Sequence, residues 1–204
     1  MQFNELLFSK SLFFSETIFI FDFMSIFGPI IFKMELNESE INFELNPNDF
    51  SAKVKFSPNA NNDVFIPYSI SYGSDKYKIT SIDDFSFYNN IYIKSINFPD
   101  NSQMKSFGKN AFKNSSIGVV HIPPNLTELK EKWCNKAFYL FQCILSNKNK
   151  NFSYLHNFEK LIILGKSDPK KVSYDTIVFA SRDFDSIIIP SSIKYIYSNT
   201  FSHF

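Results

Sequence analysis

A short sequence motif of nine residues occurs three times in this chain of 204 residues. It reads Ser-Ile-Asp-Asp-Phe-Ser-Phe-Tyr-Asn at residues 81–89, Ser-Phe-Gly-Lys-Asn-Ala-Phe-Lys-Asn at 106–114 and Tyr-Ile-Tyr-Ser-Asn-Thr-Phe-Ser-His at 195–203. Self-similarity with a period of about 20 to 50 residues is typical of a solenoid, in which each repeat packs on its neighbours. The chain is therefore predicted to be a repeat array, and such arrays offer binding surface along their length rather than a catalytic pocket.

A triplet of apolar residues recurs between the copies of this motif. Two variable residues separate its first and second members, and one variable residue separates its second and third members. The triplets are Ile93/Ile96/Phe98, Ile117/Val120/Ile122, Leu140/Cys143/Leu145 and Phe184/Ile187/Ile189. This spacing is that of the strand in a leucine-rich repeat. Because a strand alternates its faces, the last two apolar residues of each triplet point into the core together. A parallel sheet on one face of the solenoid is therefore expected.

An Ala-Phe or Ser-Phe step follows in the repeats and is expected to place one aromatic side chain in the core from a short turn or helical segment. Phe112 is such a residue. Asn89 and Asn114 come two residues after the step, and asparagine tolerates the left-handed backbone of such turns. A degenerate third repeat has Trp133 in this place. We expect Trp133 to fill the core.

Residues 1–33 differ in composition from the remainder of the chain. They are rich in Phe, Ile and Leu, but charged residues interrupt them. The longest uncharged stretch, residues 23–32, is shorter than the roughly 20 apolar residues that a membrane-spanning helix needs. Three interpretations stand side by side: a signal or membrane-associating segment, an apolar N-terminal cap, or residues upstream of a true start at Met34.

Two β-hairpins are predicted around the repeats. Residues 34–63 form an N-terminal β cap, because they alternate apolar and polar residues on both sides of an Asn-Pro-Asn-Asp turn. The repeats run over residues 64–204. Within them, an insertion at about residues 146–180 has strand-like residues at 161–165 and 176–180 around a turn-rich segment. This pattern predicts a hairpin between two solenoid turns.

Several function classes are disfavoured by composition and spacing. The net charge is +1, and Arg182 is the only arginine, which argues against nucleic-acid recognition. The three histidines are scattered, and Cys134 and Cys143 match no metal or redox spacing. The two cysteines are expected to be buried thiols. Without a nucleophile, base or metal set, neither an enzyme nor a cofactor is expected.

The outward face of the predicted sheet is the candidate binding surface. Its candidate partner-binding residues, taken from the alignment of the triplets, are Lys94, Asn97, Val119, His121, Phe141, Ile144, Asp185 and Ile188. Four of these residues are apolar at positions expected to be exposed, which is typical of a protein-binding patch. Alternatively, the N- or C-terminal segment or the inserted hairpin covers them.

These motifs resemble the BspA-like, or Treponema-type, leucine-rich repeat proteins. The best matching pieces are residues 106–114, 117–123, 184–193 and 195–201, and the resemblance covers roughly residues 64–204. The strand, turn and strand of residues 160–190 also resemble the hairpin that such proteins often carry between repeats. Members are often cell-surface antigens or adhesins of bacteria and parasitic protists, thought to bind host proteins or other cells.

The resemblance implies a β-rich α/β solenoid of leucine-rich repeats, with a parallel sheet on one face, an N-terminal hairpin cap and an inserted hairpin. It also implies a non-enzymatic scaffold at the cell surface, whose partner is a host or cell-surface protein. Two alternatives stay open: a membrane-associated protein held by residues 1–33, and an intracellular interaction scaffold.

Overall fold

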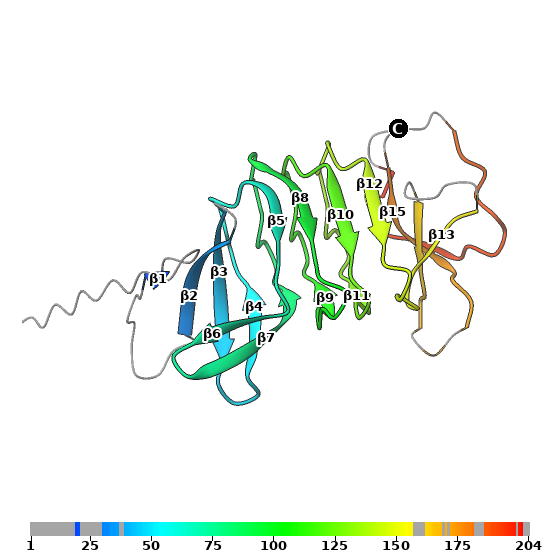
Figure 1. The fold of residues 1–204 in the computed structure, drawn as a ribbon. Helices are drawn as coiled ribbons and strands as arrows, with labels where there is room; N and C mark the ends of the chain where they lie inside the picture. Colours follow the sequence, from blue (N-terminus) through cyan, green and yellow to red (C-terminus); the bar gives the residue numbers. More distant parts are fainter. Residues whose placement is uncertain are drawn as a thin grey trace, which may run out of the picture.

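A stack of β-strands and tight turns makes up the protein (Figure 1). The computed structural model describes residues 19–20, 30–36, 39–156, 162–168, 170, 172–181, 186–198 and 200–201. These residues form strands and turns, and none of them is helical. The predicted repeat solenoid is therefore confirmed, while the helical part of the expected α/β class is corrected for the described residues.

The strands form three sheets. The first contains, in spatial order, β1 (Phe19–Ile20), β2 (Ile30–Leu36), β3 (Ser39–Asn46), β4 (Ser51–Val54), β7 (Asp75–Ile82), β9 (Ser106–Phe107) and β11 (Glu128–Leu129), with β6 (Ser69–Tyr72) paired to β7. The second contains β12 (Gln142–Leu145), β10 (Val119–Ile122), β8 (Ile93–Asn97) and β5 (Asn62–Phe65). The third contains β13 (Ser153–Tyr154), β14 (Ile162–Gly165), β15 (Thr176–Ala180) and β16 (Tyr195–Ile196).

The second sheet is the parallel sheet that the apolar triplets predict. Val120 of β10 lies beside Ile96 of β8 and Cys143 of β12, and all three side chains are fully buried. β5 adds a parallel strand next to β8 on the N-terminal side. The fourth triplet does not extend this sheet: residues 186–190 form no strand, and the sheet ends at β12.

Tight turns, rather than helices, carry the core aromatics between repeats. Each turn has two residues with left-handed backbone, Phe85, Asn110 and Lys132 at the first position and Asn89, Asn114 and Lys136 at the second, with φ between 55° and 65°. Left-handed residues interrupt a right-handed helix, which explains the missing helical segments. The turns bond to one another instead, as the Phe87 N–H does to the Ala111 carbonyl at 2.7 Å. Asn114 Nδ2 also donates to Asn89 Oδ1 at 2.8 Å. The positive φ of both asparagines confirms their expected left-handed backbone.

A column of aromatic rings runs through the repeats inside these turns. The Phe87 and Phe112 rings stack with centroids 5.2 Å apart, and Trp133 packs edge-on against Phe112 at 6.0 Å. All three side chains are buried, so Phe112 and Trp133 occupy the core as predicted. The spacings fall in the range favoured by aromatic pairs. We call Phe87, Phe112, Trp133 and Phe179 the aromatic column.

The inserted hairpin closes the C-terminal end of this column. β14 and β15 pair antiparallel, and the Phe179 ring of β15 lies 6.1 Å from Trp133. The Trp133 indole N–H donates to the Val178 carbonyl at 3.2 Å. β15 thus takes the end of the core on which the fourth triplet was expected to pack. Ile187 of that triplet packs instead against a separate small cluster around β14 and β15.

Strands β1 to β4 of the first sheet cover the N-terminal end of the solenoid, and β7, β9 and β11 continue this sheet along the repeats (Figure 1). β3 alternates buried and half-buried residues, and it forms the expected hairpin with β4. β2 pairs with β3 along its full length, and Phe32 and Met34 of β2 are buried. The boundary expected at Met34 therefore falls inside β2, whose residues 30–33 belong to the cap. Apart from these residues and β1, residues 1–33 lie outside the described part of the chain.

Lys55 joins this cap to the first repeat. Its ammonium lies 2.7 Å from Asp83 and 3.1 Å from Glu44. The hydrogen bond to Asp83 raises the pKa of Lys55 against the opposing effect of burial. Burial acts to raise the pKa of Asp83, but hydrogen bonds from Lys55 and the Asp84 N–H outweigh it and hold this pKa below its ordinary value.

The Lys55–Asp83 pair should give a pH-dependent contribution to stability. Because the pKa of Asp83 is lowered by folding, its contribution is present at neutral pH and is lost as the pH falls through that lowered pKa. We expect Lys55→Met to lower the free energy of unfolding at pH 7. The difference from the parent should shrink below about pH 4, where carboxylates take up protons. Urea unfolding at both pH values measures this, and a difference independent of pH would contradict it.

Removing one ring from the aromatic column should destabilise the whole fold. We expect Phe112→Ala to lower the free energy of unfolding by about 3–5 kcal/mol, as for a fully buried aromatic side chain. Phe56→Ala is the matched control, because Phe56 is about half exposed. Denaturant unfolding followed by circular dichroism measures both variants. Equal, small effects would show that the column does not hold the repeats together.

A candidate protein-binding face

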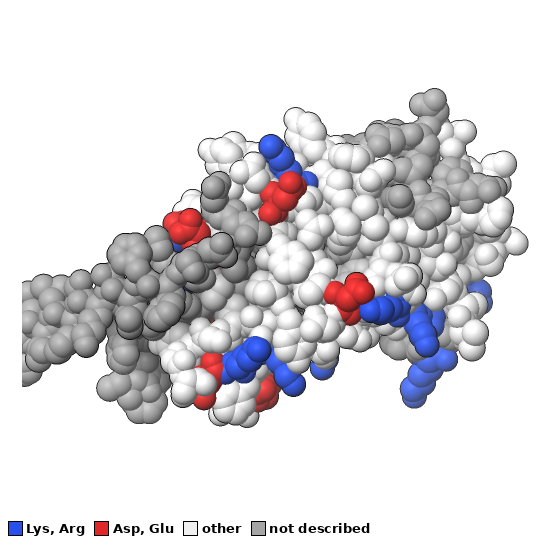
Figure 2. All heavy atoms as spheres, viewed as in Figure 1, with Lys and Arg blue, Asp and Glu red and all other residues white. Residues whose placement is uncertain are grey.

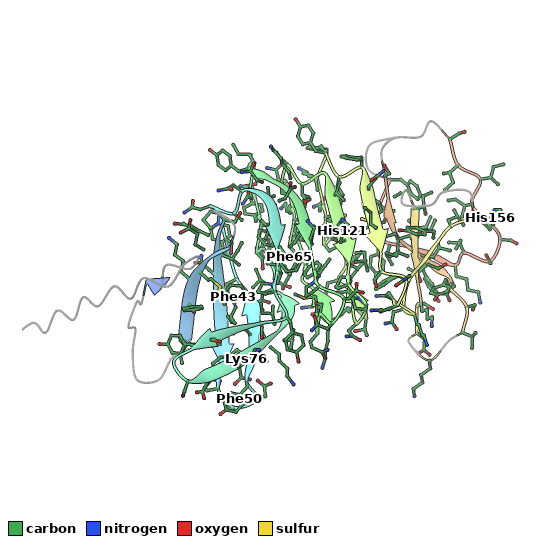
Figure 3. The ribbon with its side chains drawn as sticks, viewed as in Figure 1. Phe43, Phe50, Phe65, Lys76, His121 and His156 are labelled. Atoms are coloured by element: carbon green, nitrogen blue, oxygen red, sulfur yellow. The ribbon has the colours of Figure 1, made fainter. Side chains whose placement is uncertain are left out.

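The outward side of the second sheet presents two columns of side chains from four strands. One column consists of Asp63, Ser95, Val119 and Gln142, and the other of Phe65, Asn97, His121 and Ile144. Few charged residues lie over these strands, and most charges gather at the margins (Figure 2). Phe65 of β5 and His121 of β10 are separated by β8 (Figure 3). We call this surface the sheet face.

The β5–β8 end of the sheet face is polar and internally hydrogen-bonded. Ser95 Oγ donates to Asp63 Oδ1 at 2.7 Å. Asn97 Nδ2 donates to Ser95 Oγ at 3.0 Å. These bonds fix the orientation of three polar side chains at one end. Toward β12 the face becomes apolar through Val119 and Ile144.

His121 lies in the middle of the sheet face, between Asn97 and Ile144 in the register of the strands. It is half-buried, and this burial lowers the pKa of the imidazole below its ordinary value. The ring is therefore neutral at pH 7. A neutral ring loses less hydration free energy than a cation when another surface covers it.

An open groove lies at the N-terminal ends of the strands of the sheet face. It has a volume of about 450 Å³, and Lys94, Ser116, Gly118, Tyr139 and Phe141 line it together with Asp63 and Val119 of the face. Tyr139 and Phe141 are 66% and 42% exposed, so these rings form an apolar wall that water reaches. We call this feature the Gly118 groove.

Six of the eight predicted site residues come together on this surface: Lys94, Asn97, Val119, His121, Phe141 and Ile144. None of the described segments covers Phe141, which stays accessible. Ile188 does not join them: it is 90% exposed but lies beyond the sheet, which ends at β12. The hairpin explains this difference, since β15 closes the core in place of a further repeat strand. Asp185 lies outside the described residues.

Sequence reasoning missed four residues of this surface: Asp63, Phe65, Ser116 and Tyr139. A signal for the first two was present, because Val-Phe-Ile-Pro at residues 64–67 has the same apolar, variable, apolar, proline order as the later repeats. Tyr139 precedes its strand, and no pattern within one repeat marks it. Its role appears only when neighbouring repeats are placed side by side.

Two further kinds of site were searched for in the described residues. No group of three or more His, Cys, Asp and Glu side chains there could hold a metal ion. No helix among them is long and apolar enough to cross a membrane.

The repeat class of the chain follows from its match to a family model. Residues 58–164 and 171–204 match the BspA type leucine rich repeat region in six copies. Because the match covers well over half of the chain, the protein belongs to this family. No curated protein matches the chain.

Solved structures of leucine-rich repeat proteins are more distantly similar. The pneumococcal vaccine antigen PcpA is 15% identical with a TM-score of 0.39, over 58% of this chain and 39% of that one. A leucine-rich repeat protein from Eubacterium ventriosum is 13% identical with a TM-score of 0.43, over 79% and 54%. A leucine rich cell surface protein from Faecalibacterium prausnitzii is 14% identical with a TM-score of 0.31, over 83% and 66%. The chain thus spans 39% to 66% of the length of these proteins.

The exposure of the sheet face predicts which substitutions the fold tolerates. We expect Phe141→Glu and Ile144→Glu to leave the thermal unfolding midpoint nearly unchanged, because Phe141 is exposed and Ile144 is only half-buried on the outward side of the sheet. Val120→Glu, on the same strand as His121 but pointing inward, should unfold the protein, since it buries an unpaired charge. Differential scanning fluorimetry compares the three. Unfolding by Phe141→Glu or Ile144→Glu would show that these positions are covered.

Proposed function

We propose that this protein is a non-enzymatic scaffold that binds another protein through the sheet face. The observation that carries the proposal is a set of exposed or half-buried apolar and aromatic side chains, aligned by strand register, on a surface with few charges. Val119 lies on β10, Ile144 lies on the neighbouring strand β12, and Phe141 directly precedes β12. Contiguous exposed apolar surface of this kind marks protein interaction sites.

The rigidity of the sheet supports a binding role. The strands under the face are backed by buried residues of the aromatic column and of the triplets. The Ser95 hydroxyl bonds to Asp63 and accepts from Asn97, which holds the polar end in one arrangement. A surface that is already ordered loses little conformational entropy when a partner docks. Binding then depends on shape and on desolvation of the apolar side chains, without bond chemistry.

We propose further that this binding takes place at the cell surface. The support is membership of the BspA type repeat family, whose members are often surface antigens or adhesins. A partner on another cell or in the surrounding medium fits a scaffold of this kind.

A photo-crosslinking amino acid at position 144 tests the binding proposal. The full chain carrying it is incubated with extracts of its own cells and of cells that it contacts. We expect a discrete protein adduct, which is lost when Phe141→Glu is added to the same chain. The matched control places the crosslinker at Lys109, which is exposed on the turn side of the solenoid.

Equal adducts from positions 144 and 109, or none from position 144, would contradict binding through the sheet face. The surface proposal has its own readout in intact cells. A membrane-impermeant biotin reagent should label the full chain, and protection of the chain until the cells are lysed would contradict a surface location.

A further inference from the structure

The Gly118 groove exists because one repeat carries small residues where its neighbours carry large ones. Ser116 occupies the position that Tyr92 and Tyr139 hold in the flanking repeats. Both tyrosines are more than 60% exposed. The middle repeat therefore forms a gap between two tyrosines that project from the solenoid.

Gly118, on the next outward column, leaves room for the Phe141 ring to lie beside the gap. Its neighbours in register are Lys94 of β8 and Phe141, whose backbone N–H donates to the Gly118 carbonyl at 3.1 Å. A Cβ atom at position 118 would lie 2.9 Å from Cε1 of Phe141. The Phe141 ring therefore lies close against the glycine backbone and forms a wall of the groove, with Lys94 on the other side.

Charged groups of both signs border the groove. Lys94 makes no ion pair with any described residue. Asp63 accepts a hydrogen bond from Ser95 and likewise has no ionic partner among the residues that the structure describes. An acidic occupant would meet the Asp63 carboxylate, and a basic one would meet the Lys94 ammonium. A neutral side chain with an apolar body and a polar tip suits both.

We infer that the Gly118 groove receives the side chain of a tyrosine presented by a protein partner. The ring packs against Phe141 and Tyr139, because aromatic rings favour edge-on or offset contact with one another. The Lys94 ammonium favours the face of the same ring. The phenol hydroxyl finds hydrogen-bonding groups at the polar end, where Asp63 and Ser95 lie. This inference rests on the proposed function, since it names the group by which the partner docks.

A partner-free experiment tests the groove. N-acetyl-L-tyrosinamide is titrated into the isotope-labelled full chain, and the amide resonances are followed by NMR. We expect saturable shifts at Gly118, Val119 and Phe141. N-acetyl-L-leucinamide is the matched probe without a ring, and it should give much smaller shifts at the same positions.

Two variants locate the binding. Ser116→Tyr places in the gap the residue that both flanking repeats already tolerate, and it should abolish the shifts. Lys94→Gln should weaken tyrosinamide binding about two- to fivefold, the effect of losing an exposed cation–π contact. Lys105→Gln is the control, because Lys105 is an exposed lysine beside β9, away from the groove.

Shifts confined to the groove, dependent on the ring and lost in Ser116→Tyr support the inference. Shifts that persist in Ser116→Tyr, spread over the whole face or appear equally with leucinamide overturn it. If Ser116→Tyr does not fold, the comparison of Lys94→Gln with Lys105→Gln decides in the same way. The crosslink at position 144 is independent of these readouts, so a failed groove with a retained adduct would leave the proposed function standing.

Discussion

Stacking of one aromatic ring per repeat on the next is the interaction on which the rest of the structure depends. A single repeat here is two short strands and a turn, which cannot enclose an apolar core alone. Phe87, Phe112 and Trp133 join successive repeats into one buried column, and Phe179 ends it. Because buried aromatic area dominates the stability of such a core, the sheet on one side and the turns on the other are fixed by this column.

The column also determines where the sheet face ends. Trp133 is larger than the phenylalanines before it, and its indole N–H needs an acceptor when buried. The Val178 carbonyl supplies that acceptor, which fixes the hairpin strand β15 against the last repeat. The parallel sheet consequently stops at β12. At this edge the Tyr154 hydroxyl accepts from the Leu145 N–H and donates to the Cys143 carbonyl, which satisfies groups that a further strand would have paired.

Much of this architecture could be predicted from the sequence, because each repeat has apolar residues at the same core positions. The triplets gave the register of β8, β10 and β12, and the asparagines marked the left-handed turns. The fourth strand could not be predicted correctly, since the choice between residues 186–190 and β15 depends on packing against Trp133. The sequence left three interpretations of residues 1–33 open, because pairing of β2 with β3 is a contact between strands that composition does not show.

The candidate site was predictable only in part, for a related reason. Outward positions follow from alternation within a strand, so Val119, His121 and Ile144 could be named. The Gly118 groove instead arises from a difference between neighbouring repeats at equivalent positions. A repeat pattern keeps only what the repeats have in common, so it does not contain that difference. The register of the strands in the structure shows that Ser116 lies between Tyr92 and Tyr139.

The chain contains a single tryptophan, and its position makes it an intrinsic optical reporter. Trp133 is buried between Phe112 of the last regular repeat and Phe179 of the hairpin. Its fluorescence emission therefore reports on the contact between the last repeat and the hairpin rather than on the fold as a whole. If the hairpin separates from the repeats before they unfold, the indole becomes hydrated while the strand signal in circular dichroism persists. Tryptophan fluorescence and circular dichroism can thus distinguish separation of the hairpin from unfolding of the solenoid without any added label.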